Sequence, residues 1–361
     1  MKIIGCDFHP SFQQIAMADT ETGEQIECRL SHTDEEAKKF YEALTGPVLV
    51  GVESSGNMRW FERLLAKLGH ELRIGDATAI RASSPRKQKT DKRDAQHLLD
   101  LLLAQRFPAI WVPSMQELDL RQLLKHRHML VQTRTRVKNQ LQHIAMNEGV
   151  VQKKSKLWTQ AGLALLKSLE LDPWTKRRRD DLLVLLDQLD GHIGQLNQAA
   201  EMEAEKWPQA KLLMTHPGVG PILGLATVWT LGDVTRFENG KHVASYVGLI
   251  PSEDSSGQRR RLGAITKQGN RFMRFLLVQA GIMAARGDAG LGRFYQRLAH
   301  KKHHGVAKVA VARKLLVRLY WMLRTNTGYP EMVVRMQGSS SHPVAEAKAE
   351  LLSGRPASRS K

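Results

Sequence analysis

Cysteine is scarce in this sequence of 361 residues, which contains only Cys6 and Cys28. Two isolated thiols, with no C-x-x-C pair and no Cys/His cluster at zinc-ligand spacing, predict neither a disulfide framework nor a structural zinc site. Long apolar runs are also missing, since the longest stretches, such as 275–285, are far shorter than the roughly 20 residues of a membrane span. No secretory signal peptide opens the chain. We therefore expect a cytoplasmic protein with no membrane partner.

Acidic residues are scarce in one part of the chain. The formal net charge is +18 and the pI is near 10.0. Between residues 257 and 324, sixteen Lys or Arg residues stand against a single acid, Asp288. Because cationic contacts to phosphate release counterions, this block predicts a nucleic-acid partner. A solvated basic surface without a partner is the alternative.

The length predicts two or three domains. Short apolar runs at 2–8, 13–19 and 24–30 predict three strands, and helices and strands then alternate, which indicates an α/β domain over residues 1–112. The fold class is therefore α/β plus all-α. The further regions that we expect are a helical middle at 113–206, a mainly helical region at 207–330 and a flexible tail at 331–361.

The helical middle carries an apolar seam. Its members recur at alternating spacings of four and three, at Leu182, Leu186, Leu189, Ile193, Leu196 and Ala200. This heptad spacing suits a coiled coil, either with a helix of a second subunit or by packing within the chain.

Four carboxylates follow one another in the first quarter of the chain. Asp7 and Glu53 each close a short apolar run that predicts a buried strand, and strand ends are where open α/β sheets place ligands. Asp91 and Asp94 precede an apolar helical run and share one helix face. Four clustered anions repel one another unless a divalent cation neutralises them, so the pattern predicts a Mg²⁺ site for phosphoryl chemistry. For His9, on the same side of the strand as Asp7, we favour a packing role over support of the metal site.

A Gly-Pro turn at 217–221 lies between two predicted helices. It resembles a helix-hairpin-helix element, in which Gly218 and Gly220 would let phosphate approach backbone N–H groups at a helix N-terminus. A turn that serves only the architecture is the alternative.

A polar loop further along contains Ser255, Ser256 and Gly257. A serine hydroxyl beside guanidinium groups suits phosphoryl transfer, although such a tripeptide is most often a plain loop. The cations that we expect to contact phosphate are Arg259, Arg260, Arg261, Lys267, Arg271 and Arg274.

Together these segments resemble the insertion-sequence transposases that join an N-terminal RuvC-like DEDD domain to a C-terminal transposase domain, the family of bridge-RNA-guided serine recombinases. The segments that carry the resemblance are GCDFH, VGVESSG, KTDKRDA, HPGVGP and YVGLIPSEDSSGQRRRLGAITKQGNRFMR. Their order and spacing make the resemblance specific over roughly residues 3 to 325.

The resemblance implies a RuvC/RNase H-like fold for residues 1–112 and a transposase domain with a serine nucleophile for 207–330. Ser256, directly before the glycine, would attack the scissile phosphate, with Ser255 as the other possibility. The Mg²⁺ ligands would be Asp7, Glu53, Asp91 and Asp94. The implied partners are target DNA, donor DNA and a structured noncoding guide RNA. A homo-oligomer, dimer or tetramer, is implied because the acidic and serine sites of this family come from different subunits.

Three other function classes compete with this interpretation. In a metal-dependent RuvC-like nuclease, the acids would activate water and the serine would be incidental. An actin-like sugar kinase or ATPase also opens with a Gly-x-Asp strand, but the basic C-terminal half and the lack of further glycine-rich phosphate loops argue against it. The third alternative is a non-catalytic scaffold that binds nucleic acid. The clustered acids argue against it, because a protein that only binds a polyanion gains nothing from clustered negative charges.

Overall fold

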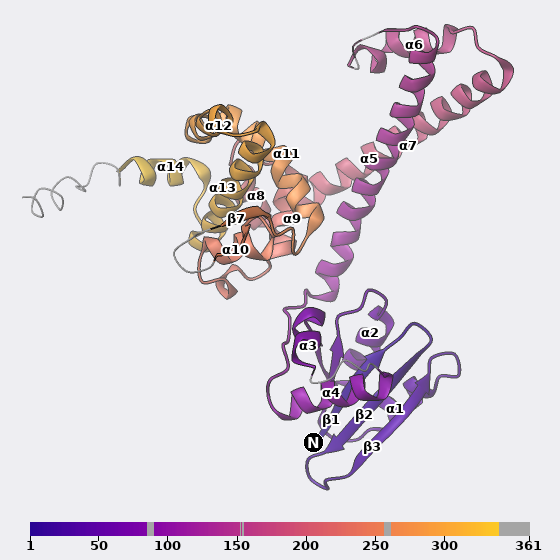
Figure 1. The fold of residues 1–361 in the computed structure, drawn as a ribbon, viewed down its shortest axis with the longest axis vertical. Helices are drawn as coiled ribbons and strands as arrows, with labels where there is room; N and C mark the ends of the chain where they lie inside the picture. Colours follow the sequence, from indigo (N-terminus) through magenta and orange to yellow (C-terminus); the bar gives the residue numbers. More distant parts are fainter. Residues whose placement is uncertain (85–89, 152, 154, 256–260, 339–361) are drawn as a thin grey trace, which may run out of the picture. The chain divides into compact units, whose positions relative to one another are not determined.

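The computed structural model describes residues 1–84, 90–151, 153, 155–255 and 261–338. The chain divides into two compact units, Met1–Val112 and the part from Pro113 onward (Figure 1). The first is a mixed α/β unit and the second is helical apart from one short hairpin, which confirms the predicted fold class at this level. None of the helices in the described residues is long and apolar enough to cross a membrane.

The first unit is built on a five-stranded sheet of order β3-β2-β1-β4-β5. The strands β1, β2 and β3 form an antiparallel meander, and β4 and β5 run parallel to β1. Their bounds are β1 (Lys2–Phe8), β2 (Phe12–Asp19), β3 (Gln25–Ser31), β4 (Val48–Glu53) and β5 (Glu71–Gly75).

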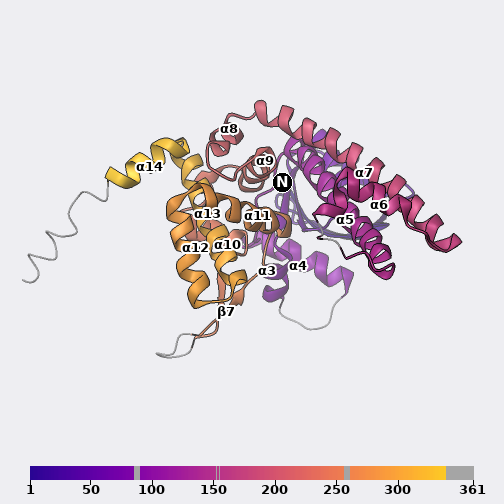
Figure 2. The same cartoon turned by 90° about the horizontal axis from the view of Figure 1, so that it is seen from above.

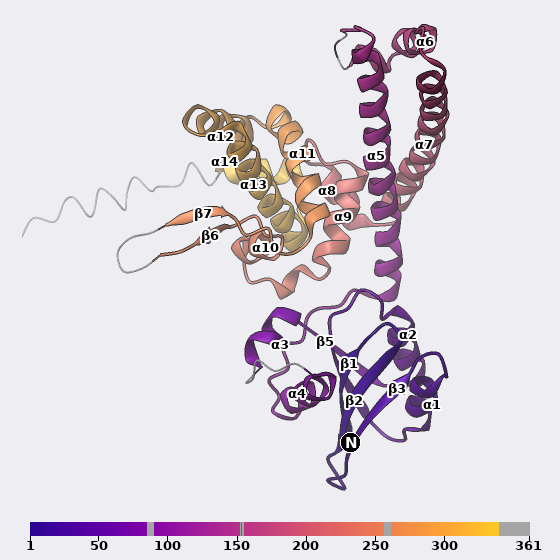
Figure 3. The ribbon, with the colours of Figure 1, turned by 45° about the vertical axis from the view of Figure 1, so that its right-hand side comes forward.

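Helices cover both faces of this sheet, because successive side chains of a strand point to opposite faces. Ile4 and Cys6 pack in a core with residues of α1 (Glu36–Ala43) and α2 (Arg59–Leu68), whereas Ile3 packs with α4 (Asp91–Leu103) on the other face. Figure 3 shows α4 and α1 on the two sides of the sheet. A short helix, α3 (Ala77–Ser83), follows β5 and is capped by Asp76.

The second unit begins with a long helical hairpin. The helices α5 (Met115–Asn147) and α7 (Pro173–Glu205) are joined through the 3-10 turn η1 (Lys156–Trp158) and α6 (Gln160–Ser168). Two hydrogen bonds link these helices: Arg127 donates to Asn197 and Arg134 donates to Asp190, both at 2.8 Å. The later residue of α5 thus pairs with the earlier residue of α7. The two helices are therefore antiparallel neighbours, as Figure 2 shows.

The heptad seam of α7 is filled within the chain. Leu186 and Leu189 are buried together with Val137 and Leu141 of α5. The alternative of packing within the chain therefore accounts for the buried part of this seam. Leu182 and Leu196 are only partly buried, and a contact of α7 with a helix of a second subunit stays a prediction.

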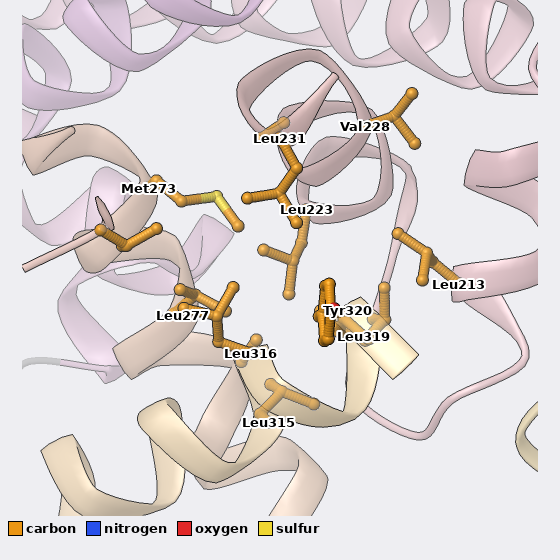
Figure 4. Close-up of a cluster of buried hydrophobic side chains, with 14 of the residues drawn as sticks. Leu213, Leu223, Val228, Leu231, Met273, Leu277, Leu315, Leu316, Leu319 and Tyr320 are labelled. Atoms are coloured by element: carbon orange, nitrogen blue, oxygen red, sulfur yellow. The ribbon is translucent and has the colours of Figure 1, made fainter. Parts of the chain in front are cut away.

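The rest of the second unit is a helical bundle around α9 (Pro221–Leu231), which is buried from Leu223 to Leu231. Leu315, Leu316 and Leu319 of α13 (His304–Thr325) pack into the same core (Figure 4). The other elements are α8 (Pro208–Met214), η2 (Val234–Arg236), α10 (Gly240–Tyr246), β6 (Pro251–Glu253), β7 (Leu262–Ile265), α11 (Arg271–Gly287), α12 (Ala289–Lys301) and α14 (Tyr329–Gly338).

The regions predicted as 113–206 and 207–330 share one core. Leu124 of α5 and Ala200 and Ala204 of α7 belong to the same buried cluster as α9 and α13. At the C-terminal end, residues 331–338 continue α14, and Met332 packs into this cluster. The expected flexible tail is therefore wrong for 331–338, and residues 339–361 lie outside the described residues.

A buried network stabilises the bundle around Asp288, whose exposed fraction is 6%. Its Oδ2 accepts hydrogen bonds from Arg318 Nη1 at 2.8 Å and from the Tyr329 hydroxyl at 2.6 Å, and its Oδ1 caps α12 at Leu291 N. Burial raises the pKa of Asp288, but these donors together lower it to about 2. The one acid between residues 257 and 324 thus has a structural role.

We expect Asp288→Asn to lower the free energy of unfolding by about 2–4 kcal/mol at neutral pH, since the change leaves Arg318 buried without its counter-ion. Because the folded pKa of Asp288 is depressed, its contribution is present above the unfolded pKa of about 4 and is lost as pH falls towards 2. Urea unfolding at pH 7 and at pH 3 measures this difference. The exposed Asp254→Asn is the control, and equal midpoints for both variants at pH 7 would contradict the assignment.

Candidate functional site

Two of the four predicted acids lie side by side at one edge of the sheet. The strands β1 and β4 are parallel, and Cys6 pairs with Val52. Asp7 and Glu53 are the next residues on these two strands, so they lie at the same edge, on the face that α4 covers.

A glycine on β1 brings the other two acids to this edge. A Cβ at Gly5 would lie 2.2 Å from Ala95 O and 2.4 Å from Leu99 N, so the backbone of α4 rests directly on the strand. The side chain of Thr90 caps α4 by accepting from Arg93 N, and the first turn that follows carries Asp91 and Asp94. The close packing of strand and helix thus positions these two carboxylates near Asp7.

Asp7, His9 and Asp91 form one compact group. His9 Nε2 lies 3.1 Å from Asp7 Oδ2 and 3.7 Å from Asp91 Oδ1, and the three ligand atoms all lie within 4.8 Å of one another. Burial raises the pKa of Asp7, His9 opposes this shift, and the negative charges of Asp94 and Asp91 raise the pKa further. Three of the four predicted acids therefore share one electrostatic site.

Glu53 has a different neighbour. Its side chain is 39% exposed, and its Oε1 lies 4.0 Å from Arg81 Nη2 of α3. Among the described residues, Glu53 is at the same sheet edge as Asp7 but is not a member of the compact group.

The structure also places residues here that sequence reasoning missed. His9, for which a packing role was favoured, lies between two carboxylates, which corrects that interpretation. Phe12 stacks on the His9 ring with centroids 4.5 Å apart, and Arg29 lies over Phe12 at 3.7 Å. Gln14, only 4% exposed, pairs directly with Asp7 across β1 and β2. The sequence feature that could have identified these residues is the short turn DFHPSFQQ. The length of this turn determines that Asp7 pairs with Gln14 and that His9 lies beside Phe12.

The donor set fits a divalent cation. Two carboxylates and an imidazole present oxygen and nitrogen atoms to one point, and the pKa of Asp7 is raised first by burial and then by the negative charges of Asp94 and Asp91, which a cation would offset. The first unit therefore contains a candidate metal centre made of Asp7, His9 and Asp91, with Asp94 adjacent.

The Gly-Pro turn lies between α8 and α9, as expected, but its first glycine serves helix packing. Gly218 has a φ of +81°, and a Cβ there would lie 2.5 Å from Ala284 N of α11. Its close backbone neighbour is thus α11, which explains the need for glycine here, while phosphate contact at the exposed Gly218 stays a prediction. Gly220 precedes α9 and has open space around its Cβ position, so phosphate contact at Gly220 stays a prediction.

The serine loop connects β6 and β7. Ser256, Arg259 and Arg260 lie outside the described residues. The exposed Ser255 donates from Oγ to Glu253 Oε1 at 3.0 Å and accepts from Arg261 N at 3.1 Å. The hydroxyl of Ser255 is therefore part of the hairpin's own hydrogen bonding.

The three remaining predicted phosphate contacts differ from one another. Arg274 donates from Nη1 to the carbonyls of Val247, Gln268 and Gly269, so this nitrogen holds the neighbouring backbone, and phosphate contact by the rest of the guanidinium stays a prediction. Lys267 and Arg271 are exposed. Further exposed cations follow on α11, on α12 and just after α12, at Arg286, Arg293, Arg297, Lys301 and Lys302.

Comparison with known families agrees with this geometry. The model of the DEDD transposases of IS110 type, described as "Transposase", matches residues 4–146 and so contains the acidic group. The model described as "Transposase IS116/IS110/IS902 family" matches residues 210–296. The chain is thus similar to transposases of the IS110 family in both of its units. It is accordingly an enzyme that acts on DNA, and its DEDD domain, consistent with a RuvC-like fold, implies dependence on a divalent metal.

Individual relatives of the transposase extend along most of the chain. A protein of Pseudomonas aeruginosa named "Probable family 20 transposase" is 25% identical over 90% of this chain and 98% of its own length. The transposase for insertion sequence element IS1328 of Yersinia enterocolitica is 26% identical over 77% of this chain and 84% of its own. A "Pilin gene-inverting protein" of Moraxella lacunata is 28% identical over 68% of this chain and 69% of its own.

Proposed function

We propose that this transposase cuts and rejoins DNA strands of a mobile element through a metal-binding acidic centre and a serine nucleophile. The proposal depends mainly on one observation, the convergence of β1 and α4 that places Asp7 within reach of Asp91 and Asp94. Glu53, at the same sheet edge, would complete the acidic set.

A divalent cation bound there, Mg²⁺ in our proposal, would neutralise charge on the scissile phosphate and orient it. The chain's own residues set up this site before the substrate arrives. Gly5 lets α4 pack closely against β1, and an oxygen of Asp7 and one of Asp91 lie within 4.8 Å of each other. The half-buried position of Asp7 limits the number of waters that compete for its oxygens.

Ser256 would supply the covalent step. Attack of its hydroxyl oxygen on phosphorus forms a seryl phosphodiester and breaks the bond to the oxygen of the leaving strand, which takes up a proton. Attack by a strand hydroxyl on the same phosphorus reverses the step and releases the serine, so no energy source is needed. Arg259, Arg260 and Arg261 would stabilise the transition-state charge.

The proposed partners are target DNA, donor DNA and a structured noncoding guide RNA. The resemblance described above supports the RNA, and the basic residues of α11 to α13 offer phosphate contacts for either nucleic acid. A relative named for the inversion of a pilin gene supports recombination over simple cutting. The assembly would be a homo-oligomer in which acidic and serine sites come from different subunits.

A paired serine substitution tests the covalent step. We expect Ser256→Ala to reduce strand joining by at least about 10³-fold and to eliminate the detergent-stable protein–DNA adduct on a nicked trapping substrate, because no other group replaces the nucleophile. Ser255→Ala is the matched control and should form the adduct at nearly the normal rate. Unimpaired cutting by Ser256→Ala would instead support a metal-dependent nuclease without a covalent intermediate, the second candidate function, which the DEDD match to the acidic domain favours.

The RNA partner has its own test. RNA that copurifies with the transposase should map to the flanks of its gene when sequenced. Absence of such RNA, or reads that map elsewhere, would exclude RNA guidance and leave the DNA chemistry as proposed.

A further inference from the structure

We propose that His9 is a direct ligand of the divalent cation, beside Asp7 and Asp91, and that the metal centre therefore binds Mn²⁺ more tightly than Mg²⁺. This inference rests on the proposed metal-dependent function and adds a nitrogen ligand to a set otherwise made of carboxylates.

The distances suit an octahedral site. With metal–ligand bonds of about 2.1 Å, neighbouring ligand atoms lie about 3.0 Å apart and opposite ones about 4.2 Å apart. His9 Nε2 is 3.1 Å from Asp7 Oδ2 and 3.7 Å from Asp91 Oδ1, within this range. All three ligand atoms lie within 4.8 Å of one another, so a single cation could contact each of them.

Contacts with Phe12 hold the His9 imidazole in this position. The backbone N–H of His9 donates to Phe12 O at 2.9 Å, which closes the turn between β1 and β2. The Phe12 ring then stacks on the imidazole at an interplanar angle of 21°, and the Arg29 guanidinium lies over Phe12. A histidine needed only for packing would be surrounded by apolar side chains, whereas this ring directs its Nε2 at two carboxylates.

The ligand types predict the metal preference. Mg²⁺ is a hard cation that takes oxygen ligands, whereas imidazole nitrogen suits transition metals. A site with two carboxylates and one imidazole therefore gains affinity for Mn²⁺. We expect Mn²⁺ to bind at least about 10-fold more tightly than Mg²⁺, and His9→Gln to weaken Mn²⁺ binding by about 10–100-fold.

Pulsed electron paramagnetic resonance of Mn²⁺ bound to the full chain tests the ligand directly. The wild-type protein with less than one equivalent of Mn²⁺ should show modulation from a coordinated ¹⁴N nucleus, which changes to the ¹⁵N pattern when histidine is ¹⁵N-labelled. His9→Gln should retain the Mn²⁺ signal at higher metal concentration but lose the modulation. His70→Gln, on a histidine that bonds Tyr41 O elsewhere in the first unit, is the control and should retain it.

The outcomes separate the two proposals. Wild-type protein that binds Mn²⁺ in an Asp7-dependent way without nitrogen modulation would overturn His9 as a ligand and leave the proposed function intact. Mn²⁺ binding that is absent, or that is unaffected by Asp7→Asn, would overturn the metal centre itself. The wild-type and Asp7→Asn proteins together decide between these cases, so the test holds even if His9→Gln folds poorly.

Discussion

Asp7→Asn is expected to reduce DNA cleavage and strand joining by at least about 10³-fold while the protein stays folded. The carboxylate is the acid around which His9, Asp91 and Asp94 gather, and an amide cannot supply the negative charge that holds a cation. Cleavage of labelled DNA in Mg²⁺ and in Mn²⁺ measures the loss, and isothermal titration with Mn²⁺ measures metal affinity.

Folding is not expected to suffer from this change. Burial and the charges of Asp94 and Asp91 disfavour the ionised form of Asp7, so a neutral isostere relieves repulsion and should leave the thermal midpoint equal or higher. Asp100→Asn, on an exposed residue of the same helix α4, is the control and should keep full activity. If Asp7→Asn recombines DNA normally, the chain acts as a scaffold and the acidic centre has no catalytic role.

Gly5→Ala is expected to have the largest effect on the stability of the first unit. The added methyl would lie 2.2 Å from Ala95 O and 2.4 Å from Leu99 N, and both are backbone atoms that cannot rotate away. The helix α4 must move, which costs about 1–3 kcal/mol or more and displaces Asp91 and Asp94 from Asp7. We expect a lower thermal midpoint and loss of both Mn²⁺ affinity and DNA cleavage.

A second glycine in the same unit provides the matched control. A Cβ at Gly56 meets nothing within 4 Å, so Gly56→Ala should leave the thermal midpoint and the Mn²⁺ affinity almost unchanged. Equal behaviour of the two variants would show that α4 does not depend on contact at Gly5 for its position.

The sequence predicted those parts of the site that depend on local pattern. Apolar runs ending in Asp7 and Glu53 are visible in the chain because a buried strand needs them, and the spacing of Asp91 and Asp94 places them on one turn of α4. His9 was assigned to packing because its partners are set by the turn to β2 and by the approach of α4, neither of which a short pattern encodes.

Other gaps in the prediction arose because one pattern satisfies two tertiary arrangements. The seam through Leu186 and Leu189 is equally suited to a second subunit and to α5, and only the fold selects α5. Arg274 belongs to a basic block that predicts phosphate binding, and its Nη1 also donates to three backbone carbonyls, a structural role that the prediction did not include. Such carbonyls carry no side-chain signature, so composition alone cannot reveal them.

One end of the α5–α7 hairpin packs into the bundle core through Leu124, Ala200 and Ala204. The other end has a separate small core that includes Leu157 and Leu166. A helix of 33 residues is about 50 Å long, so a tilt of about 5° at the anchored end moves the far end by roughly 4 Å. A small change of angle where the hairpin joins the bundle is therefore amplified along the two helices into a displacement of several ångströms at the far end.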